Sequence, residues 1–567
     1  MITKPEVDSV TLATVWGALR QTCFDMRHLV ERTAQNYLIT ELHDLSVGIW
    51  DASGRTLSVP IGIAVHFLGT SFVVKSVLEK FQGNLRPGDV ILTNDPYHGG
   101  HTNHLPDWGF LYPIFYKDEL VFWTLVRGHQ QDSGGAFPGG YFPNGYDIHS
   151  EGLVIPPTKV IEEGRERREL MDLILANVRF PEGMKIDTSA MMAAGKLSEI
   201  RLTALLDKYG KDVVLRCADT MISRMEQAVK DEIRKIPEGI SYEGESWIDD
   251  DGTDLDVPVP VRCKLIRKGD ELIVDLSDNV PQRKGFINQP YATTYAISVG
   301  AVVLVLDPAL AELHNEGSMR AIQVIAPPGT LVNPLYPATV GGGPAAIGAT
   351  LTEAILQALS KALPERSIAG AGRQRVDNIF GFDPRRDRKY MSVSFNKVGC
   401  MGAAYGYDGY QTILIYGRGA MTRGSVEEEE VRFPWRYLKW ECATDLQGAG
   451  KWRGGPGIHW EAVNEGGEAG ITTGACDGDE MVVQGLLGGH ANPVSRTYVR
   501  RGGEEIRIKS HRMFPSQQGD VLVKLSSGGA GVGDPRERDR EKVLEDVRNG
   551  IVSLEAARSI YGLTDNP

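Results

Sequence analysis

Long hydrophobic runs are missing from this chain of 567 residues, in which the longest apolar stretch extends only from Ala296 to Leu306. A helix that crosses a bilayer needs about 20 apolar residues, so we expect neither a transmembrane segment nor a membrane partner. The N-terminus carries Glu6 and Asp8 where a secretory signal needs a basic start and an apolar stretch. These absences favour a cytoplasmic protein.

Cysteine and positive charge are also scarce. The six cysteines lie far apart without a CxxC pair, so the spacing indicates neither a disulfide framework nor a cysteine-bound zinc site. The formal net charge of −13 argues against nucleic acid as a partner, because such proteins concentrate lysine and arginine on one face. Both observations fit a protein of the reducing cytoplasm.

Two catalytic motifs are absent. There is no GxxxxGK[ST], and the nearest approach, AAGKLS at 193–198, lies inside a helical pattern. The glycine runs GGGPAA and GGAGVG lack the lysine of a phosphate loop, so we do not expect ATP to bind by that route. We interpret these runs as tight turns that require positive φ. The lack of a GxSxG elbow argues against a serine hydrolase.

The first part of the chain mixes helical and strand patterns. Apolar residues between Thr11 and Val30 recur at helical spacing, which predicts a long amphipathic helix. Helical periodicity returns in 188–236. Between these segments we predict short strands, separated by Gly, Pro and Asn turns, at 45–51, 89–95, 110–115 and 120–128.

Beyond Pro237 the pattern changes to strands and turns. Alternation on both sides of 268–270 predicts a hairpin, and 347–363 predicts a helix. Two short helical segments near the C-terminus have predicted caps at Gly550, Ser553 and Gly562. We therefore predict an α+β fold, with a helix-plus-sheet region at 1–237 and a β-rich region with a central helix at 238–567.

Histidines gather in the N-terminal region, where eight of the 12 lie within the first 150 residues. The loop NDPYHGGHTNHLPDW places His104 and Asp107 three residues apart, and His129 follows an apolar strand pattern. Side chains at strand ends and in adjoining loops can converge on one point. Imidazole nitrogen with carboxylate oxygen suits zinc, manganese or ferrous iron, and the lack of cysteine favours an open catalytic site.

Other residues are candidates to complete this site. Asp44, at the start of the strand LSVGIWD, is a candidate fourth ligand. We expect that residues behind the ligands orient the imidazoles, and the candidates are Asp95, His98 and Asp132. The alternative is that these histidines are surface or hydrogen-bonding groups, because the HxxD spacing also occurs by chance.

The remaining N-terminal histidines have simpler interpretations. We expect His101 to be solvated, and His43 and His66 to be packed core residues. Several aromatic residues follow the second histidine loop and fit a pocket wall and a core equally well: Tyr141, Phe142 and Tyr146.

Segments along nearly the whole chain carry a family resemblance. They are ELHDLSVGIWDASGR, NDPYHGGHTNHLPD, GHQQDSGG, PGGYFPNGYDIHSEG, LIVDLSDNVPQRKGFIN and the C-terminal GGAGVGDPRERDREKVLEDVRNGIVSLEAARSIYG. These segments resemble the hydantoinase B/oxoprolinase family, which contains ATP-dependent N-methylhydantoinases, 5-oxoprolinases, a lactamase and the larger subunits of acetone and acetophenone carboxylases. The resemblance implies a hydantoinase A-type partner subunit, of the actin and sugar-kinase fold, that binds ATP with Mg.

The resemblance also implies ligand roles. The HxPD motif of the family matches His104 and Asp107, the histidine about one strand later matches His129, and the aspartate of the early D-[FL]-S motif matches Asp44. In the family these residues bind metal, so we expect one divalent ion, zinc or manganese, in this chain.

The chain departs from the common family pattern in two places. GGHTNHLPDW is two residues longer than the usual GGTHLPD and adds His101, so its loop conformation can differ from that of the family. GHQQD stands where hydantoinases usually have HHAD, and together with the segment GGYFPNGYDIHSEGL it favours the ketone-carboxylase branch. We therefore expect a subunit of a hetero-oligomeric ATP-dependent carboxylase, with a small third subunit, that converts a methyl ketone and bicarbonate to a 3-oxo acid. The metal would polarise the carbonyl, and Asp132 or His149 would remove the α-proton.

Two other functions remain open. The first is a subunit of an ATP-dependent cyclic-amide hydrolase of the N-methylhydantoinase, 5-oxoprolinase or lactamase type, which would use the same metal site. The second is a non-catalytic scaffold subunit, against which the intact His104, Asp107 and His129 argue.

Overall fold

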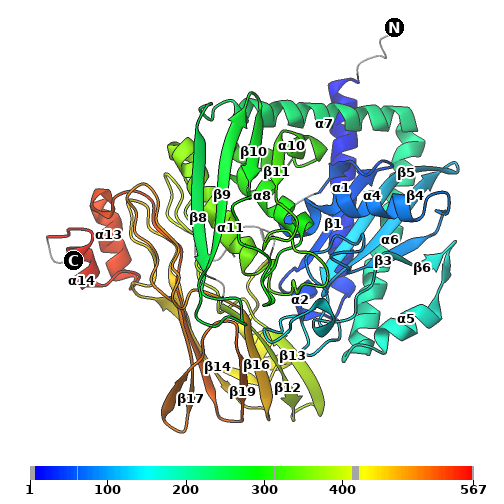
Figure 1. The fold of residues 1–567 in the computed structure, drawn as a ribbon. Helices are drawn as coiled ribbons and strands as arrows, with labels where there is room; N and C mark the ends of the chain where they lie inside the picture. Colours follow the sequence, from blue (N-terminus) through cyan, green and yellow to red (C-terminus); the bar gives the residue numbers. More distant parts are fainter. Residues whose placement is uncertain (1–6, 60–61, 312, 374, 411–420, 565–567) are drawn as a thin grey trace.

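The computed structural model in Figure 1 describes residues 7–59, 62–311, 313–373, 375–410 and 421–564. It combines helices with four sheets, which confirms the predicted α+β class. No helix among the described residues has both the length and the apolar character that a bilayer crossing requires.

The N-terminal part is built on a seven-stranded sheet with the order β2-β1-β5-β4-β3-β6-β7. All neighbouring strands are antiparallel. The strands are β1 (Leu45–Asp51), β2 (Thr56–Ser58), β3 (Val90–Thr93), β4 (Asp107–Tyr116), β5 (Glu119–His129), β6 (Thr158–Glu162) and β7 (Arg165–Glu166). The sheet therefore includes all four strands predicted in this part of the chain, and β4 is longer than expected.

Helices cover both faces of this sheet (Figure 1). On one face lie α1 (Ser9–Thr33) and α6 (Pro181–Tyr209), which share a hydrophobic core with β1, β4, β5 and α7 (Lys211–Ile233). The other face packs against α4 (Thr70–Lys80), a helix that was not predicted. The AAGKLS segment lies within α6, where Gly195 brings the helix close to the ring of Tyr112.

The second sheet has the order β11-β10-β9-β8 and includes the predicted hairpin. Its strands are β8 (Ser241–Ile248), β9 (Val259–Lys268), β10 (Glu271–Asp275) and β11 (Ile322–Ile325). Glu271 pairs with Lys268 across a turn in which Gly269 has a φ of 62°. The predicted helix α11 (Ile347–Ala362) packs on this sheet and on α8 (Tyr291–Val305).

Two further sheets form the C-terminal part, with the orders β13-β12-β16-β19 and β14-β15-β20-β17-β18. Their strands are β12 (Arg375–Asp383), β13 (Arg388–Val393), β14 (Trp435–Ala443), β15 (Gly457–Asn464), β16 (Ala469–Cys476), β17 (Arg496–Arg501), β18 (Glu504–Arg507), β19 (Met513–Ser516) and β20 (Val521–Ser526). Lys524 of β20 contacts Asp377 of β12, so the two sheets meet through buried charged side chains.

Short helices complete the chain. Ser553 caps α14 by accepting the N–H of Ala556, and Gly550 and Gly562 follow α13 and α14 with positive φ, as predicted. These helices are α2 (Tyr37–Thr40), α3 (Ala64–Phe67), η1 (Ile148–Ser150), α5 (Arg168–Leu175), α9 (Pro308–Ala311), α10 (Glu316–Arg320), η2 (Pro364–Arg366), α12 (Val426–Arg432), η3 (Pro535–Glu537), α13 (Arg540–Arg548) and α14 (Leu554–Ser559).

The glycine runs require a different explanation from the one expected. In GGGPAA and GGAGVG only Gly533 has a positive φ, at 76°. A Cβ on Gly529 would lie 2.1 Å from the Met401 carbonyl oxygen, and one on Gly343 would lie 2.2 Å from that of Asn288. The expectation of left-handed turns is therefore wrong for most of these glycines, which instead allow backbone segments to approach closely.

The division into regions at 237 and 238 remains a prediction. The seven-stranded sheet ends before this point and the other three sheets begin after it. However, one hydrophobic cluster contains both Trp50 and Trp460, which belong to opposite sides of the proposed boundary.

Candidate metal centre

Three central strands of the N-terminal sheet bring the predicted ligands together. Asp107 begins β4 and pairs directly with His129, the last residue of β5. Leu45 at the start of β1 pairs with Gly128, so Asp44 lies next to the same strand end. His104 precedes Asp107 in the loop before β4. The antiparallel register thus places four residues from distant parts of the sequence at the same end of three neighbouring strands.

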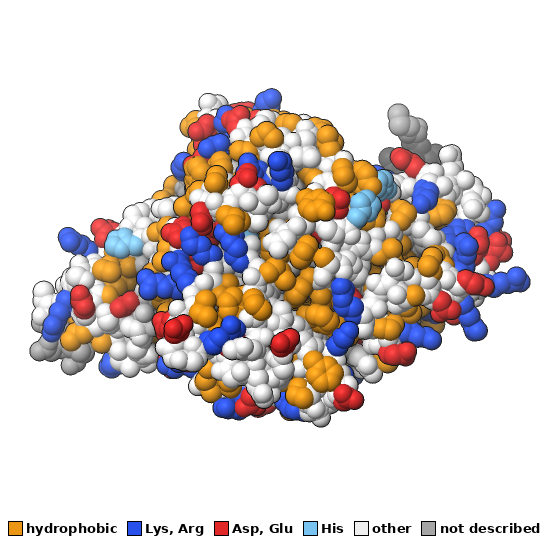
Figure 2. Space-filling view, turned by 60° about the horizontal axis from the view of Figure 1, so that its bottom comes forward, with side chains coloured by type: hydrophobic (Ala, Val, Ile, Leu, Met, Phe, Trp, Pro, Cys, Tyr) orange, Lys and Arg blue, Asp and Glu red, His pale blue; other side chains and the backbone are white. Residues whose placement is uncertain are grey.

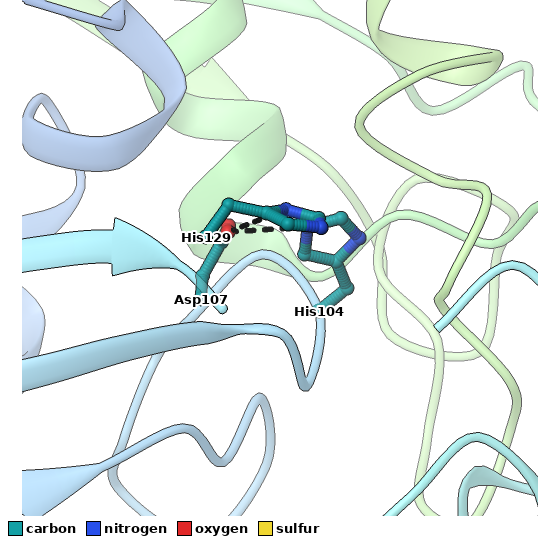
Figure 3. A group of neighbouring side chains, drawn as sticks. All are labelled: His104, Asp107 and His129. Carbon is teal, nitrogen blue, oxygen red and sulfur yellow. Dashed lines mark ion pairs between the residues drawn. The ribbon is translucent and has the colours of Figure 1, made fainter. Parts of the chain in front are cut away.

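Three of these side chains form a compact buried group (Figure 3). Asp107 Oδ1 lies 3.2 Å from His104 Nε2 and 3.3 Å from His129 Nδ1. One ligand atom from each residue lies within 4.8 Å of the others. Asp44 is also buried, and its Oδ2 lies 4.0 Å from His129 Nδ1. The geometry therefore places Asp44 beside the group of three.

The donor atoms fit a divalent cation. Asp107 Oδ1 is buried and accepts no aligned hydrogen bond, although two imidazole nitrogens lie close to it. Ligands bound tetrahedrally at ~2.0–2.1 Å lie roughly 3.3 Å from one another, which is close to both nitrogen–oxygen distances. Two imidazoles with carboxylates suit zinc or manganese.

Other residues hold the ligands in place, and the sequence did not indicate them. His104 Nδ1 donates to the carbonyl oxygen of Gly341 at 3.0 Å, which directs Nε2 toward Asp107 and reserves that nitrogen as the predicted metal donor. Asn103 Nδ2 donates to Asp107 Oδ2 at 2.8 Å, and Thr293 Oγ1 donates to Asn103 Oδ1 at 3.0 Å. The ligand orientation therefore depends on segments from both parts of the chain.

His66 belongs to this site as well as to the core. It is buried, as expected, but its Nε2 lies 3.4 Å from Asp107 Oδ2 and 3.7 Å from Asp44 Oδ1. On the other side of the ring, Nδ1 lies 3.4 Å from Ser46 Oγ. The interpretation of His66 as only a packing residue is therefore incomplete, because its imidazole bridges two predicted ligand carboxylates.

The neighbouring side chains favour ionised groups in this cluster. Burial would raise the pKa of Asp107, but the neighbouring His104 and His66 outweigh this effect and hold that pKa well below its usual range. Burial would lower the pKa of His104, yet the Asp107 carboxylate reverses the shift and raises it. The site thus keeps a carboxylate in a buried position, where a cation stabilises it.

The two predicted bases lie outside the cavity at this site. Asp132 is fully buried, and its carboxylate accepts the Arg179 Nη1 at 3.0 Å and the Arg179 backbone N–H at 2.6 Å. His149 is exposed in η1, with Nε2 2.9 Å from the Tyr336 hydroxyl. Neither residue lines the cavity beside the metal cluster, so their catalytic roles remain predictions without support from the geometry.

Two candidates for orienting the imidazoles instead contact each other. His98 Nδ1 lies 3.1 Å from Asp95 Oδ2, and the His98 side chain is half exposed.

His101 is half-buried rather than solvated, because its ring packs on Phe72 and its Nε2 lies 3.0 Å from Ser76 Oγ.

His43 is not a core residue, since its side chain is 31% exposed and its Nδ1 lies 2.9 Å from Glu31 Oε1. The pairing with an acidic side chain on α1 keeps this imidazole at the surface of the helix.

A small, mainly apolar cavity of about 30 Å³ lies beside the cluster. Tyr141 lines it and packs on both histidine rings, with centroid distances of 5.6 Å to His104 and 6.4 Å to His129. Tyr146 is instead exposed, and Phe142 does not line the cavity. The apolar wall also includes Leu38, Ile63, Val65, Pro344, Val376, Val393, Phe395 and Met421.

Comparison with known proteins identifies relatives over almost the whole chain. The sequence model of the Hydantoinase B/oxoprolinase family matches residues 8–535. The beta subunit of caprolactamase from Pseudomonas jessenii is 32% identical, over 98% of this chain and 96% of that protein. The B-type component of a putative D-/L-hydantoinase from Pseudomonas sp. (strain NS671) is 29% identical, over 99% of this chain and 95% of that protein.

Solved structures give the same result for the fold. The crystal structure of the ATP-dependent caprolactamase from Pseudomonas jessenii superposes with a TM-score of 0.91 at 30% identity, and the match covers 99% of this chain and 97% of that one. Nucleotide-free acetone carboxylase superposes with a TM-score of 0.90 at 19% identity, over 98% of this chain and 79% of that one. At that identity the second likeness carries the fold alone.

Proposed function

Because the chain belongs to the hydantoinase B/oxoprolinase family, we propose that it is the metal-binding subunit of an ATP-dependent enzyme that opens cyclic amides. The observation that carries this proposal is the full-length similarity to one of the caprolactamase subunits. It favours the amide-hydrolase alternative over the ketone carboxylase expected from the loop motifs, because the acetone carboxylase is similar only in fold.

A partner subunit forms part of the proposal. The caprolactamase and hydantoinase relatives above are each named as one of several subunits, and this chain lacks a phosphate loop. We assign the binding of ATP and Mg to a hydantoinase A-type partner. The present chain would then supply the site at which the amide carbon reacts.

The site residues have separate tasks in this proposal. His104, Asp107 and His129, with Asp44, would hold one divalent ion, which when bound supplies Lewis acidity and lowers the pKa of water. Gly341 fixes the His104 ring through its Nδ1, and Asn103 fixes the Asp107 carboxylate. These contacts keep the ligand atoms in position before a substrate arrives.

The cavity wall suits a ring of hydrocarbon character. Its described side chains are mainly apolar, and apart from the predicted metal centre and Asn103 none carries a charge or an amide. A volume of about 30 Å³ holds one or two water molecules but no ring. A cyclic substrate would therefore have to displace part of the described wall.

The overall chemistry consumes two water molecules. One adds across the amide bond to give a carboxylic acid and an amine, and the other converts ATP to ADP and phosphate. In the proposed route, the γ-phosphoryl group first joins the amide oxygen and finally leaves as inorganic phosphate. The energy of ATP thereby drives the opening of a stable amide.

The test is reconstitution of this chain with its A-type partner. We expect caprolactam or a related neutral lactam to stimulate ADP formation, with one ring-opened amino acid per ADP. Hydantoin and 5-oxoproline are tested in the same assay to define which cyclic amides the reconstituted enzyme accepts. If acetone with labelled bicarbonate gave a labelled 3-oxo acid, and no cyclic amide was opened, the amide-hydrolase proposal would be wrong and the carboxylase would replace it.

A further inference from the structure

A second and larger hollow, which we call the basic groove, has a volume of about 970 Å³. It is lined by the end of α1, the start of α2, the first turn of α6, part of β13 and α12. Five basic side chains line it: Arg179, Arg386, Arg388, Lys389 and Arg432. Three acidic side chains do so: Glu182, Asp187 and Glu428.

Only some of these charges are compensated. Arg432 pairs with Glu428, and Arg179 pairs with Asp132. The carboxylate of Asp187 accepts the backbone N–H groups of Gln35 and Asn36 at 2.7 and 3.1 Å.

The excess positive charge lies on β13 and the turn before it. Arg388 and Lys389 are exposed, and neither forms an ion pair in the described parts of the chain, although the strand pairing sets Arg388 opposite Asp383. The Arg386 side chain donates to the Val431 carbonyl oxygen at 2.7 Å, and together with Arg385 it helps to hold the pKa of Asp383 below its usual value. Glu182 and Asp187, whose hydrogen bonds go to neutral backbone N–H groups, remain to offset these three cations, so the described lining keeps one excess positive charge in a chain whose net charge is −13.

The basic groove adjoins the metal centre. Tyr37 lines the groove, and the next residue, Leu38, lines the metal cavity. Asn36 also lines the groove, and its Nδ2 donates to the carbonyl oxygen of His129 at 2.7 Å. Neighbouring residues of one short segment therefore line both the groove and the cavity at the proposed site of amide opening.

Aromatic rings form a second feature of the groove wall. Tyr37, Tyr390 and Phe433 all line it, and the Tyr37 and Phe433 rings meet edge to face at 5.7 Å. Figure 2, which brings the bottom of Figure 1 forward, shows basic, acidic and hydrophobic side chains interspersed over this side of the molecule. Basic groups beside apolar rings suit a small organic anion.

We propose that the basic groove binds the phosphoryl group generated by the ATP-dependent reaction, either on the activated amide or as released phosphate. The source of that group rests on the proposed function, whereas the binding site rests on the charges and geometry described here. Arginine and lysine form strong charge-assisted hydrogen bonds with phosphate oxygens. A phosphate anion would compensate the excess positive charge that the structure leaves in the groove.

The experiment uses the full chain without its partner, so that it needs no turnover. Inorganic phosphate and cyclohexyl phosphate, a stable phosphate ester with a hydrocarbon ring, are titrated by calorimetry at low salt. The variant Arg388→Gln/Lys389→Gln is compared with Lys75→Gln/Arg224→Gln, which removes two exposed cations outside the groove. We expect phosphate affinity to fall by at least about tenfold in the first variant and to stay unchanged in the control.

The two ligands distinguish the sources of the phosphoryl group. Tighter binding of cyclohexyl phosphate indicates the activated substrate, because the aromatic wall adds contacts with the ring, and equal binding indicates released phosphate. Equal phosphate affinity in both double variants, or none in the unmodified chain, would overturn the proposal. A poly-glutamate peptide that binds where phosphate does not would instead identify an interface for an acidic partner segment.

This outcome is separable from that of the proposed function. Loss of phosphate binding in the groove variant, together with failure to open any cyclic amide, would retain the anion site and reject the amide hydrolase. Amide opening without phosphate binding would reject the groove proposal alone.

Discussion

The imidazole of His104 is held by the carbonyl oxygen of Gly341, which lies 237 residues further along the chain. His104, Asp107 and His129 could be predicted as ligands, because their types and their positions at strand ends were visible in the sequence. Gly341, Asn103 and Thr293 could not, because a backbone carbonyl and neutral side chains have no chemical signature until folding brings them to a ligand.

We predict that substitutions of the histidines cause a graded loss of bound metal. His104→Ala or His129→Ala should weaken metal binding by more than the ~10–100-fold typical of changes behind the ligands, because each removes a proposed donor atom. His66→Gln should fall within that lower range, since His66 contacts the carboxylates Asp107 and Asp44. Elemental analysis and competition with a chelator measure both effects.

His98→Gln is the matched control for this series, because His98 lies in the same loop but pairs with Asp95 away from the cluster. It should retain the metal content of the unmodified protein. Unchanged metal content in folded His104→Ala and His129→Ala proteins would show that the ion binds elsewhere or not at all.

At the level of elements, the packing of α6 on the sheet depends on a glycine. A Cβ on Gly195 would lie 2.1 Å from the ring of Tyr112, whose hydroxyl donates to the Met192 carbonyl oxygen at 2.9 Å. We expect Gly195→Ala to lower the free energy of unfolding by roughly 1–3 kcal/mol, because this overpacking exceeds the gain in helix propensity. Chemical denaturation measures the change.

Gly17→Ala is the control, since Gly17 lies inside α1 with nothing within 4 Å of an added Cβ. It should stabilise the protein by roughly 0.5–1 kcal/mol. Equal stabilisation by both substitutions would mean that α6 does not approach the sheet as closely as described.

The elements that could be predicted have a clear hydrophobic periodicity or clear flanking turns of Gly, Pro and Asn. Helix α1 has one apolar face, and β1 coincides with the predicted strand. Helix α8 is apolar on almost all sides because it is buried, so it lacks the stripe from which a surface helix is recognised. The glycine runs were misinterpreted because close approach between distant backbones leaves no local pattern in the sequence.

For the whole molecule, the missing phosphate loop predicts dependence on a partner. The isolated chain should not hydrolyse ATP, and addition of the A-type partner should restore ATP hydrolysis that depends on a cyclic amide. Coupled measurement of ADP formation tests this expectation. In the reconstituted mixture, the His104→Ala chain is the control. ADP formation that persists with this variant comes from the intact partner or from a contaminant.

Sustained ADP formation by the purified chain alone, at a level per milligram of protein that repeated purification does not lower, would contradict the assignment of ATP to the partner. It would indicate a nucleotide site that the sequence motifs do not reveal.

The strands that carry the predicted ligands have a further consequence. β1, β5 and β4 are neighbours inside the seven-stranded sheet and are not its edges, so fraying of an edge strand does not open the site. The stability of these strands then limits how fast a bound ion escapes, and isotope exchange of the metal should be no faster than amide-hydrogen exchange in β5. We therefore predict that the proposed ion is acquired while the chain folds, from the metals available at that moment, and is retained afterwards.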